Sequence, residues 1–137
     1  MDGKEIDRFL LADGDAVTVG RASLDAASPL GQLVAAGKLA GLSREHAVLQ
    51  ARGKNLIVRD AGSSGGTTIR PWNNQRKKHG ISERLSEGVP RKVGLRDQIT
   101  LGDVLTIERS GKTIADAHSL RVGVPSSALA DGPTVTD

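Results

Sequence analysis

The sequence predicts an all-β protein, a sandwich or barrel of short antiparallel strands. Short apolar runs are separated by glycine-containing turns, which is the pattern of strands joined by hairpins. The chain has 137 residues, which suits one domain with one hydrophobic core. Its only aromatic residues other than histidine are Phe9 and Trp72, so we expect a core of Val, Ile, Leu and Ala side chains.

Nine segments are predicted to be strands. In chain order they are residues 5–12, 16–20, 47–51, 56–60, 67–70, 91–93, 99–101, 104–109 and 113–117. Asp13, Arg52 and Ser110 are each followed by glycine, and a tight hairpin often needs positive φ at that position. Each of these dipeptides is therefore predicted to be a hairpin turn.

One short helix is predicted inside the long connection between residues 21 and 43. Ser28 can cap the helix, Pro29 suits its first position and Gly37 can end it. The apolar residues expected on its buried face are Leu30, Leu33 and Val34.

The end of the chain, residues 118–137, is predicted to be a flexible tail. It is rich in Gly, Pro and Ser and has few apolar residues. The folded domain is accordingly expected to occupy residues 1–117.

Composition narrows the class of protein. The chain has no cysteine, which excludes disulfides and cysteine-based metal sites. Its net charge of +3 is too small to indicate a nucleic-acid-binding protein. No apolar run approaches the ~18 residues of a membrane span, and the first residues lack the apolar run of a signal peptide. We therefore expect a soluble cytoplasmic protein that does not insert into a membrane.

No catalytic or metal-binding motif is evident. The three histidines are far apart in sequence, so neither a metal nor another cofactor is expected. Ser43 and His46 suit a nucleophile and its base, but no nucleophile-elbow motif surrounds the serine. A triad assembled in space remains an alternative at this stage. The glycine-rich segment 62–66 precedes a strand, so it lacks the helix N-terminus that nucleotide-binding loops use.

Groups that suit a phosphate occur at three places. Arg21 follows Gly20 at the end of a predicted strand, and its planar guanidinium matches phosphate oxygens. Ser43 and Arg44 add a hydroxyl and a second cation, and residues 63–64 add two serine hydroxyls within a glycine-rich turn. Together they predict a phosphate site built from loops and side chains.

In order and spacing, these motifs resemble the signature of the forkhead-associated (FHA) domain. That signature runs Gly-Arg, then Ser-x-x-His, then a turn similar to Asp-x-Gly-Ser-Thr-Asn-Gly-Thr. The chain has Gly20-Arg21, Ser43-Arg44-Glu45-His46, the turn from Asp60 to Thr67, and Leu101-Gly102-Asp103. The resemblance spans about residues 4–117. It implies a two-sheet antiparallel β-sandwich of about eleven strands, with the predicted helix in a long loop, whose loops at one end bind a phosphothreonine peptide.

The resemblance also implies roles for individual residues. By position, Arg21 and Ser43 would hold the phosphate, Arg44 would flank the peptide, and Ser64 would stand in for the family's usual threonine. His46 would fix the loops, and Gly20, Gly62 and Gly66 would be required by the backbone. Gly65 occupies the place of an asparagine that bonds the bound peptide, which predicts weaker peptide binding. We expect an asparagine to fit at residue 65 and to tighten that binding.

The function implied is non-catalytic binding of phosphothreonine on a partner protein, a serine/threonine kinase or its substrate, in kinase signalling. An alternative is an FHA-like scaffold that binds an unmodified or anionic partner through its long connections, residues 21–43 and 67–89. The second connection carries Trp72 and the basic run Arg76-Lys77-Lys78, which suit nucleic acid or an acidic partner. We interpret the run as a solvated hairpin tip and do not expect nucleic acid as a partner.

Overall fold

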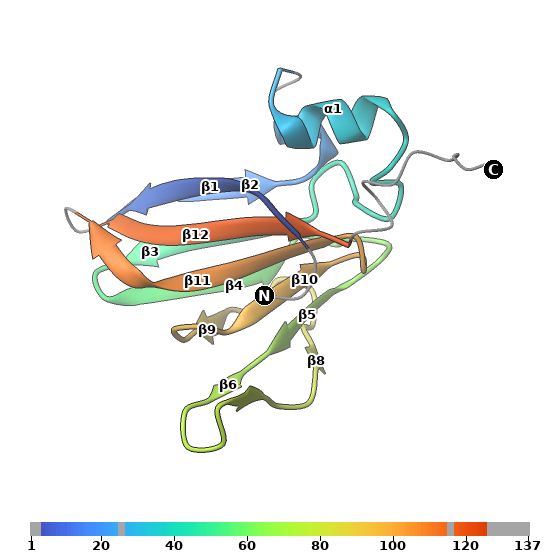
Figure 1. Cartoon of the computed structure of the whole chain (residues 1–137). Helices are drawn as coiled ribbons and strands as arrows, with labels where there is room; N and C mark the ends of the chain where they lie inside the picture. Colours follow the sequence, from blue (N-terminus) through green and yellow to red (C-terminus); the bar gives the residue numbers. More distant parts are fainter. Residues whose placement is uncertain (1–3, 25–26, 115–116, 126–137) are drawn as a thin grey trace.

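The computed structural model describes residues 4–24, 27–114 and 117–125 of the chain. Within these ranges it has twelve strands, one α-helix and one short 3₁₀ helix (Figure 1). In chain order the elements are β1 (Lys4–Ala12), β2 (Ala16–Val19), η1 (Arg21–Ser23), α1 (Pro29–Ala35), β3 (Ala47–Arg52), β4 (Asn55–Asp60), β5 (Thr67–Arg70), β6 (Trp72–Asn73), β7 (Lys78–His79), β8 (Glu83–Arg84), β9 (Arg91–Val93), β10 (Gln98–Leu101), β11 (Leu105–Ile114) and β12 (Ala117–Val124).

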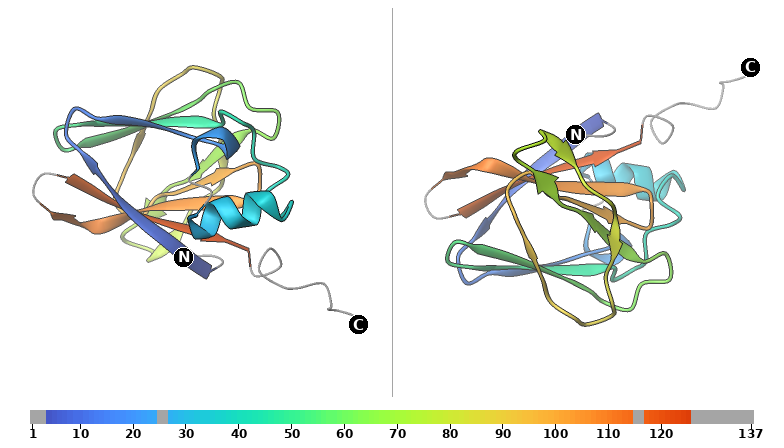
Figure 2. Two further views of the ribbon diagram at one scale, coloured as in Figure 1. Left: turned by 90° about the horizontal axis from the view of Figure 1, so that it is seen from above. Right: turned by 90° about the horizontal axis from the view of Figure 1, so that it is seen from below.

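Two antiparallel sheets lie face to face and form a sandwich (Figure 2). One sheet has six strands in the order β1-β12-β11-β10-β5-β8, and the other has four in the order β2-β3-β4-β9. Strands β6 and β7 form a separate hairpin that extends away from the sandwich (Figure 1). The predicted fold class, an all-β sandwich, is confirmed.

The core between the two sheets is aliphatic, as predicted. Leu49, Leu56, Ile69, Ile99 and Leu105 are all 0% exposed. Each points to the inner face of its sheet, and the residues next to it in the strand point to the outer face, because successive side chains of a strand point to opposite faces. Fully burying a side chain of this size contributes about 1.5–3 kcal/mol, so this layer supplies much of the stabilisation.

Helix α1 forms where Ser28, Pro29 and Gly37 predict it. The Ser28 hydroxyl accepts a hydrogen bond from the Gly31 N–H at 3.0 Å, and Pro29 is the first helical residue. Gly37 follows the helix with φ of 73°. Leu30 is 4% exposed and anchors the helix to the core.

Seven of the predicted strands begin and end within one residue of strands β1 to β5, β9 and β10. The hairpin predicted at Arg52-Gly53 is confirmed, because it joins the paired strands β3 and β4, with φ of 59° at Gly53. Asp13-Gly14 is a turn, with φ of 84° at Gly14, but the hairpin predicted there is wrong, because β1 and β2 belong to different sheets. The turn predicted at Ser110-Gly111 is wrong, because both residues lie within β11. The register with β12 shifts in that region, and such an irregularity absorbs extra residues without ending the strand.

The flexible tail predicted from His118 onward is wrong for residues 118–124, which belong to strand β12. This strand pairs with β1 on one side and β11 on the other. Leu120 and Val124 are 0% exposed and Val122 is 2% exposed, so the strand contributes to the core. The alternating residues Leu120, Val122 and Val124 suit a strand, but the Gly, Pro and Ser content of residues 118–137 outweighed this signal in the prediction. Residues 126–137 lie outside the described ranges, and the tail there stays a prediction.

The basic run forms the exposed tip of the β6–β7 hairpin. Arg76, Lys77 and Lys78 are exposed, and the Asn73 carboxamide oxygen accepts the backbone N–H groups of Gln75 and Arg76 at 3.0 Å each. Hydrogen bonds from a side chain to the backbone of its own turn fix the shape of that turn without contacts from other parts of the protein.

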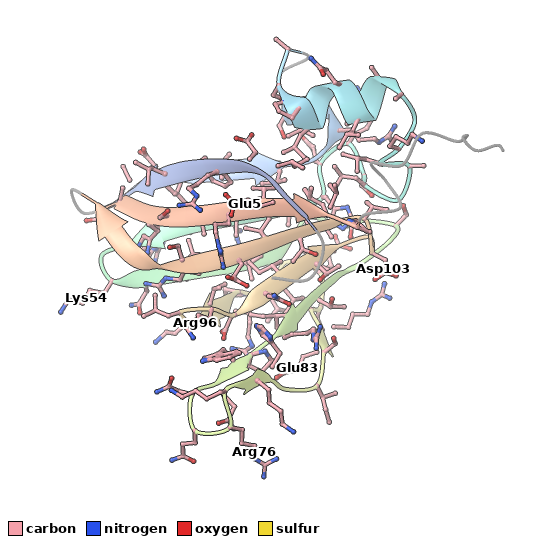
Figure 3. The ribbon with its side chains drawn as sticks, viewed as in Figure 1. Glu5, Lys54, Arg76, Glu83, Arg96 and Asp103 are labelled. Carbon is pink, nitrogen blue, oxygen red and sulfur yellow. The ribbon has the colours of Figure 1, made fainter. Side chains whose placement is uncertain are left out.

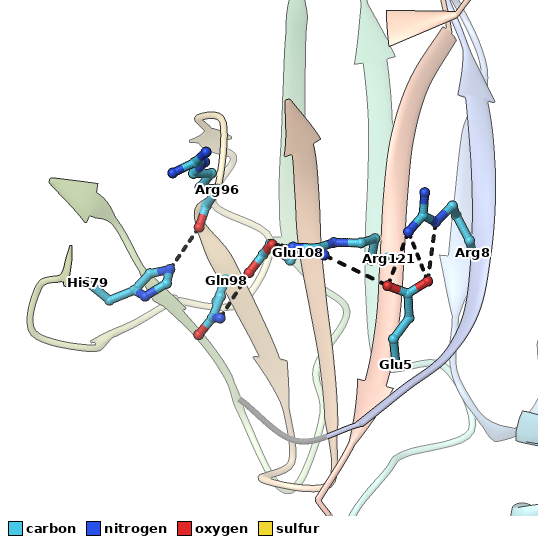
Figure 4. A network of polar contacts seen from close by, with 7 residues as sticks. All are labelled: Glu5, Arg8, His79, Arg96, Gln98, Glu108 and Arg121. Atoms are coloured by element: carbon cyan, nitrogen blue, oxygen red, sulfur yellow. Dashed lines mark hydrogen bonds and ion pairs between the residues drawn. The ribbon is translucent and has the colours of Figure 1, made fainter. Parts of the chain in front are cut away.

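A row of polar residues crosses the outer face of the six-stranded sheet (Figure 4). The Gln98 Nε2 donates to Glu108 Oε1 at 3.0 Å, and the Arg121 guanidinium forms an ion pair with Glu108. Arg121 also lies 3.8 Å from a carboxylate oxygen of Glu5. Glu108 is only 4% exposed, so these neighbours replace the water that its charge would otherwise require.

Candidate functional site

Four loops meet at one end of the sandwich, where strands β2, β5 and β10 begin or end. The first loop follows β2, the second follows α1, the third follows β4 and the fourth follows β10. The backbone N–H of Arg21 donates to the Ser43 carbonyl at 3.0 Å, and that of Ser64 donates to Ser43 Oγ at 3.1 Å. The Gly102 N–H donates to the Gly66 carbonyl at 2.9 Å. Figure 3 shows Asp103 at this end of the sandwich and Lys54 at the opposite end. Segments that are far apart in sequence are thereby joined into one surface.

His46 lies beneath these loops and is 0% exposed. Its Nδ1 accepts the N–H of Ser43 at 3.0 Å, so the ring proton is on Nε2, which donates to the Gly66 carbonyl at 2.7 Å. One buried ring therefore ties the second loop to the third. Because backbone groups occupy both ring nitrogens, His46 cannot take a proton from the Ser43 hydroxyl, and this geometry does not support a catalytic pair.

Asp60 organises the third loop from the end of β4. Its carboxylate accepts the N–H groups of Gly62 and Ser63 at 3.0 and 3.1 Å, and the hydroxyl of Thr67 at 2.6 Å. Burial alone would raise the pKa of Asp60, yet the hydrogen bonds from these groups and the Ser63 hydroxyl hold the pKa below its ordinary value. No role was predicted for Asp60, although an aspartate two residues before a glycine is a signal of such a turn.

Arg21, Ser43 and Ser64 are brought together at the surface. The Arg21 Nε donates to the Leu42 carbonyl at 2.6 Å, and the rest of the described chain offers no partner to its terminal nitrogens. The Ser43 and Ser64 hydroxyl oxygens lie 3.4 Å apart. Arg21 and Ser64 are exposed and Ser43 is half-buried, so a ligand can reach all three.

Arg44 lies beside this group and not within it. Its carbonyl accepts the Ala22 N–H at 3.1 Å, and its exposed side chain lines a shallow hollow of about 440 Å³ with Glu45 and Ala61. This position is at the edge of the surface formed by Arg21 and the two serines.

Two of the glycines are required because other backbone comes too close. A Cβ at Gly20 would lie 2.1 Å from the Arg44 carbonyl oxygen. A Cβ at Gly65 would lie 2.8 Å from the Gly41 carbonyl oxygen and 2.9 Å from the Gly102 Cα, with the His46 ring next at 3.8 Å. A side chain at residue 65 would thus point into packed backbone. The expectation that asparagine fits there is wrong, because the loop that follows α1 fills the space.

The remaining two glycines have positive φ, 87° at Gly62 and 81° at Gly66. Such angles are rarely adopted by other residues. A Cβ at Gly66 would also lie 2.8 Å from Cζ of Arg84, an exposed residue of β8. This further cation beside the site was missed by sequence analysis, and no motif around it could have indicated its position.

One comparison with known proteins identifies a family. The family model of the FHA domain matches residues 17–102. Among solved structures, the chain is similar to the solution structure of the FHA domain of an Arabidopsis thaliana hypothetical protein, with 20% identity and a TM-score of 0.45 over 82% of this chain and 70% of that one. A comparison with curated proteins finds no match. Within the described ranges there is no helix with the length and apolar character needed to cross a membrane.

Proposed function

Because the chain belongs to the forkhead-associated (FHA) domain family, we propose that it binds a phosphothreonine residue of a partner protein at the loops around Arg21, Ser43 and Ser64. FHA domains are in general phosphopeptide-binding modules and not enzymes. We propose that this chain acts by binding alone, in a cytoplasmic signalling pathway, and that its partner is a serine/threonine kinase or a substrate of one.

The arrangement of Arg21 beside the two serines carries this proposal. The Arg21 Nε is held by the Leu42 carbonyl, so its two terminal nitrogens are aimed and available to phosphate oxygens. Ser43 Oγ accepts the Ser64 N–H, which leaves its own proton free to donate to the phosphate. The site thus offers a fixed guanidinium and hydroxyl donors, the groups that recognise a dianionic phosphate.

The loops are also ordered before any ligand arrives. His46 and Asp60 fix the backbone of the second and third loops through hydrogen bonds between 2.5 and 3.1 Å. A binding surface that is already ordered loses less conformational entropy on binding. We propose that His46, Asp60, Gly20, Gly62 and Gly66 act in this way, without contacting the peptide.

The test is calorimetric titration of the protein with a phosphothreonine peptide, its phosphoserine analogue and its unphosphorylated form. Arg21→Ala should lower affinity for the phosphothreonine peptide at least tenfold, since hydrogen bonds to charged groups contribute about 1.5–3 kcal/mol. Arg52→Ala is the matched control, because Arg52 is an exposed arginine at the far end of β3. If Arg21→Ala and Arg52→Ala bind the peptide equally well, the phosphate is bound elsewhere.

A further inference from the structure

A second hollow lies at the opposite end of strands β5 and β10 from the phosphate site. It has a volume of about 690 Å³ and is lined by Trp72, Lys77, Arg91, Leu95, Arg96 and Asp97 among others. Strand β5 (Thr67–Arg70) lies between Gly66 at the phosphate site and Trp72 at this hollow. Strand β10 (Gln98–Leu101) lies between Asp97 at the hollow and Gly102 at the phosphate site. Figure 3 shows Arg96 and Asp103 near opposite ends of β10. At about 3.3 Å per residue, each four-residue strand separates the two sites by more than 10 Å.

The hollow is held in shape by hydrogen bonds beneath it. The Asp97 carboxylate accepts the backbone N–H groups of Trp72 and Gly94, both at 2.7 Å. The His79 Nε2 lies 2.8 Å from the Arg96 carbonyl oxygen (Figure 4), and its ring meets the Trp72 ring edge-on at 5.0 Å between centroids. The hairpin is therefore fastened to the turn between β9 and β10.

Arg96 takes a conformation that the turn imposes on it. Its φ is 66°, a left-handed value that is uncommon for residues other than glycine. In this conformation its guanidinium carbon lies 5.3 Å from the centroid of the Trp72 ring, a cation–π distance. The Arg96 cation is thus positioned over the hollow before a partner arrives.

The charges that face the hollow are positive. Asp97 is only 7% exposed, and Arg109 lies close enough to it for an attractive charge interaction. Arg91 pairs with Glu83 at 3.4 Å, but both side chains are well exposed, and such surface pairs are weak. Lys77, Arg91 and Arg96 come from three separate segments of the chain and converge here.

The surrounding segment concentrates the charge of the protein. Residues 70–97 include eight basic and three acidic residues, a net charge of +5, whereas the whole chain carries +3. The remainder of the chain therefore has a net charge of −2. This asymmetry attracts a negatively charged partner to one part of the molecule.

We propose that this hollow binds an acidic peptide segment of a partner protein, with carboxylates at Lys77, Arg91 and Arg96 and an apolar side chain against Leu95. Leu95 is 51% exposed and lies beside Pro71 and Trp72, which supplies an apolar floor among the cations. Single-stranded nucleic acid fits less well. Such binding uses several stacking aromatic rings, whereas the single Trp72 ring is already covered by Arg96 and edged by His79.

The proposal concerns a second surface and does not depend on phosphothreonine binding. Trp72 is the only tryptophan, so its fluorescence reports directly on the hollow. The probe is an unphosphorylated twelve-residue peptide, about two thirds Asp and Glu around a central Leu. Its control has the same sequence with Asn and Gln in place of the acids. The acidic peptide should change Trp72 fluorescence saturably at about 50 mM salt and more weakly at about 200 mM, and the neutral peptide should have no effect.

Arg96→Gln and Lys77→Gln should each weaken binding of the acidic peptide about five- to tenfold. Lys92→Gln is the matched control, because Lys92 is an exposed cation of β9 that does not line the hollow. Arg21→Ala should leave this binding unchanged, which separates it from the phosphate site. Thermal unfolding of each variant shows that it is folded.

Three results would overturn the proposal. The first is the absence of a saturable signal up to millimolar peptide. The second is an equal loss of binding in Lys92→Gln, which would indicate general charge attraction. The third is tighter binding of a twelve-nucleotide single-stranded oligothymidylate than of the acidic peptide, which would make the partner nucleic acid.

Discussion

Replacing Gly65 with alanine tests whether the loop after α1 really fills the space beside residue 65. The added Cβ would lie 2.8 Å from the Gly41 carbonyl oxygen and 2.9 Å from the Gly102 Cα. Both contacts are with backbone, which cannot rotate away as the end of a side chain can. Forcing an extra methyl group into packed surroundings typically costs about 1–3 kcal/mol.

Whether Gly65→Ala raises or lowers the stability of the protein distinguishes free space from filled space beside residue 65. Gly65 is not among the residues with positive φ, so its backbone conformation suits alanine. With free space, alanine would stabilise the protein by about 0.4–1 kcal/mol, because the unfolded chain loses flexibility. We therefore expect Gly65→Ala to destabilise the protein by about 1–3 kcal/mol only because of the contacts with Gly41 and Gly102.

Gly80→Ala is the matched control. Gly80 also lacks positive φ, and a Cβ there would meet its nearest neighbours, atoms of Pro71, at an ordinary 3.7 Å. Urea unfolding followed by far-ultraviolet circular dichroism should show Gly80→Ala at least as stable as wild type and Gly65→Ala less stable. A Gly65→Ala protein as stable as Gly80→Ala would refute the account of residue 65.

Three other substitutions test the contacts beneath and beside the site. His46→Ala should lower the free energy of unfolding by about 2–4 kcal/mol, because it leaves a cavity, removes the partner of the Ser43 N–H and removes one of the two donors to the Gly66 carbonyl. His79→Ala, at a half-buried position on the hairpin, should cost less in the same urea titration. Asp60→Asn should destabilise the protein by about 1–2 kcal/mol at neutral pH. Although burial alone would raise the pKa of Asp60, hydrogen bonds lower it below the usual 3.8, so its stabilising contribution is present above that value and is lost as pH falls through the lower folded pKa. The difference between wild type and Asp60→Asn should accordingly shrink in unfolding curves recorded between about pH 5 and pH 2, and a constant difference would contradict this assignment. Arg121→Met should destabilise the protein by about 3 kcal/mol or more, because it leaves the Glu108 charge buried without its ion-pair partner. The double variant Arg121→Met/Glu108→Met should recover most of that loss. If calorimetric melting finds the double variant no more stable than Arg121→Met alone, the two residues are not coupled.

Sequence reasoning succeeded where the signal is local. Ser28 and Pro29 mark the start of α1, and Gly14 and Gly53 mark two turns, because each acts on its own backbone or on residues next to it. Short apolar runs, residues 47–49 and 56–58, identify β3 and β4 for the same reason. The family resemblance then placed Arg21, Ser43 and Ser64 in one site, and the structure brings them together.

The errors arose where structure depends on distant partners. Strand β12 pairs with β11, which directly precedes it, but also with β1 from the other end of the described chain, so only part of its pairing is local. Arg84 reaches the site only through the pairing of β8 with β5, which no local pattern predicts. Residue 65 looked open to substitution because the approach of Gly41 and Gly102 is a property of the folded loops.

The position of β1 at the edge of its sheet has a consequence for biosynthesis. Its hydrogen-bonded neighbour in the sheet is β12, at the other end of the described chain, so Lys4 pairs with Val124 and Ala12 with Ala117. A ribosome adds about 5–20 residues per second, so β1 waits on the order of 10 s for β12 to be made. Strands β2, β3, β4 and β9 can pair during that interval, since all of their neighbours in the sheet precede β12 in the chain. The backbone of β1 lacks its hydrogen-bonding partner meanwhile, and unpaired strand edges of this kind are prone to aggregation and are bound by chaperones.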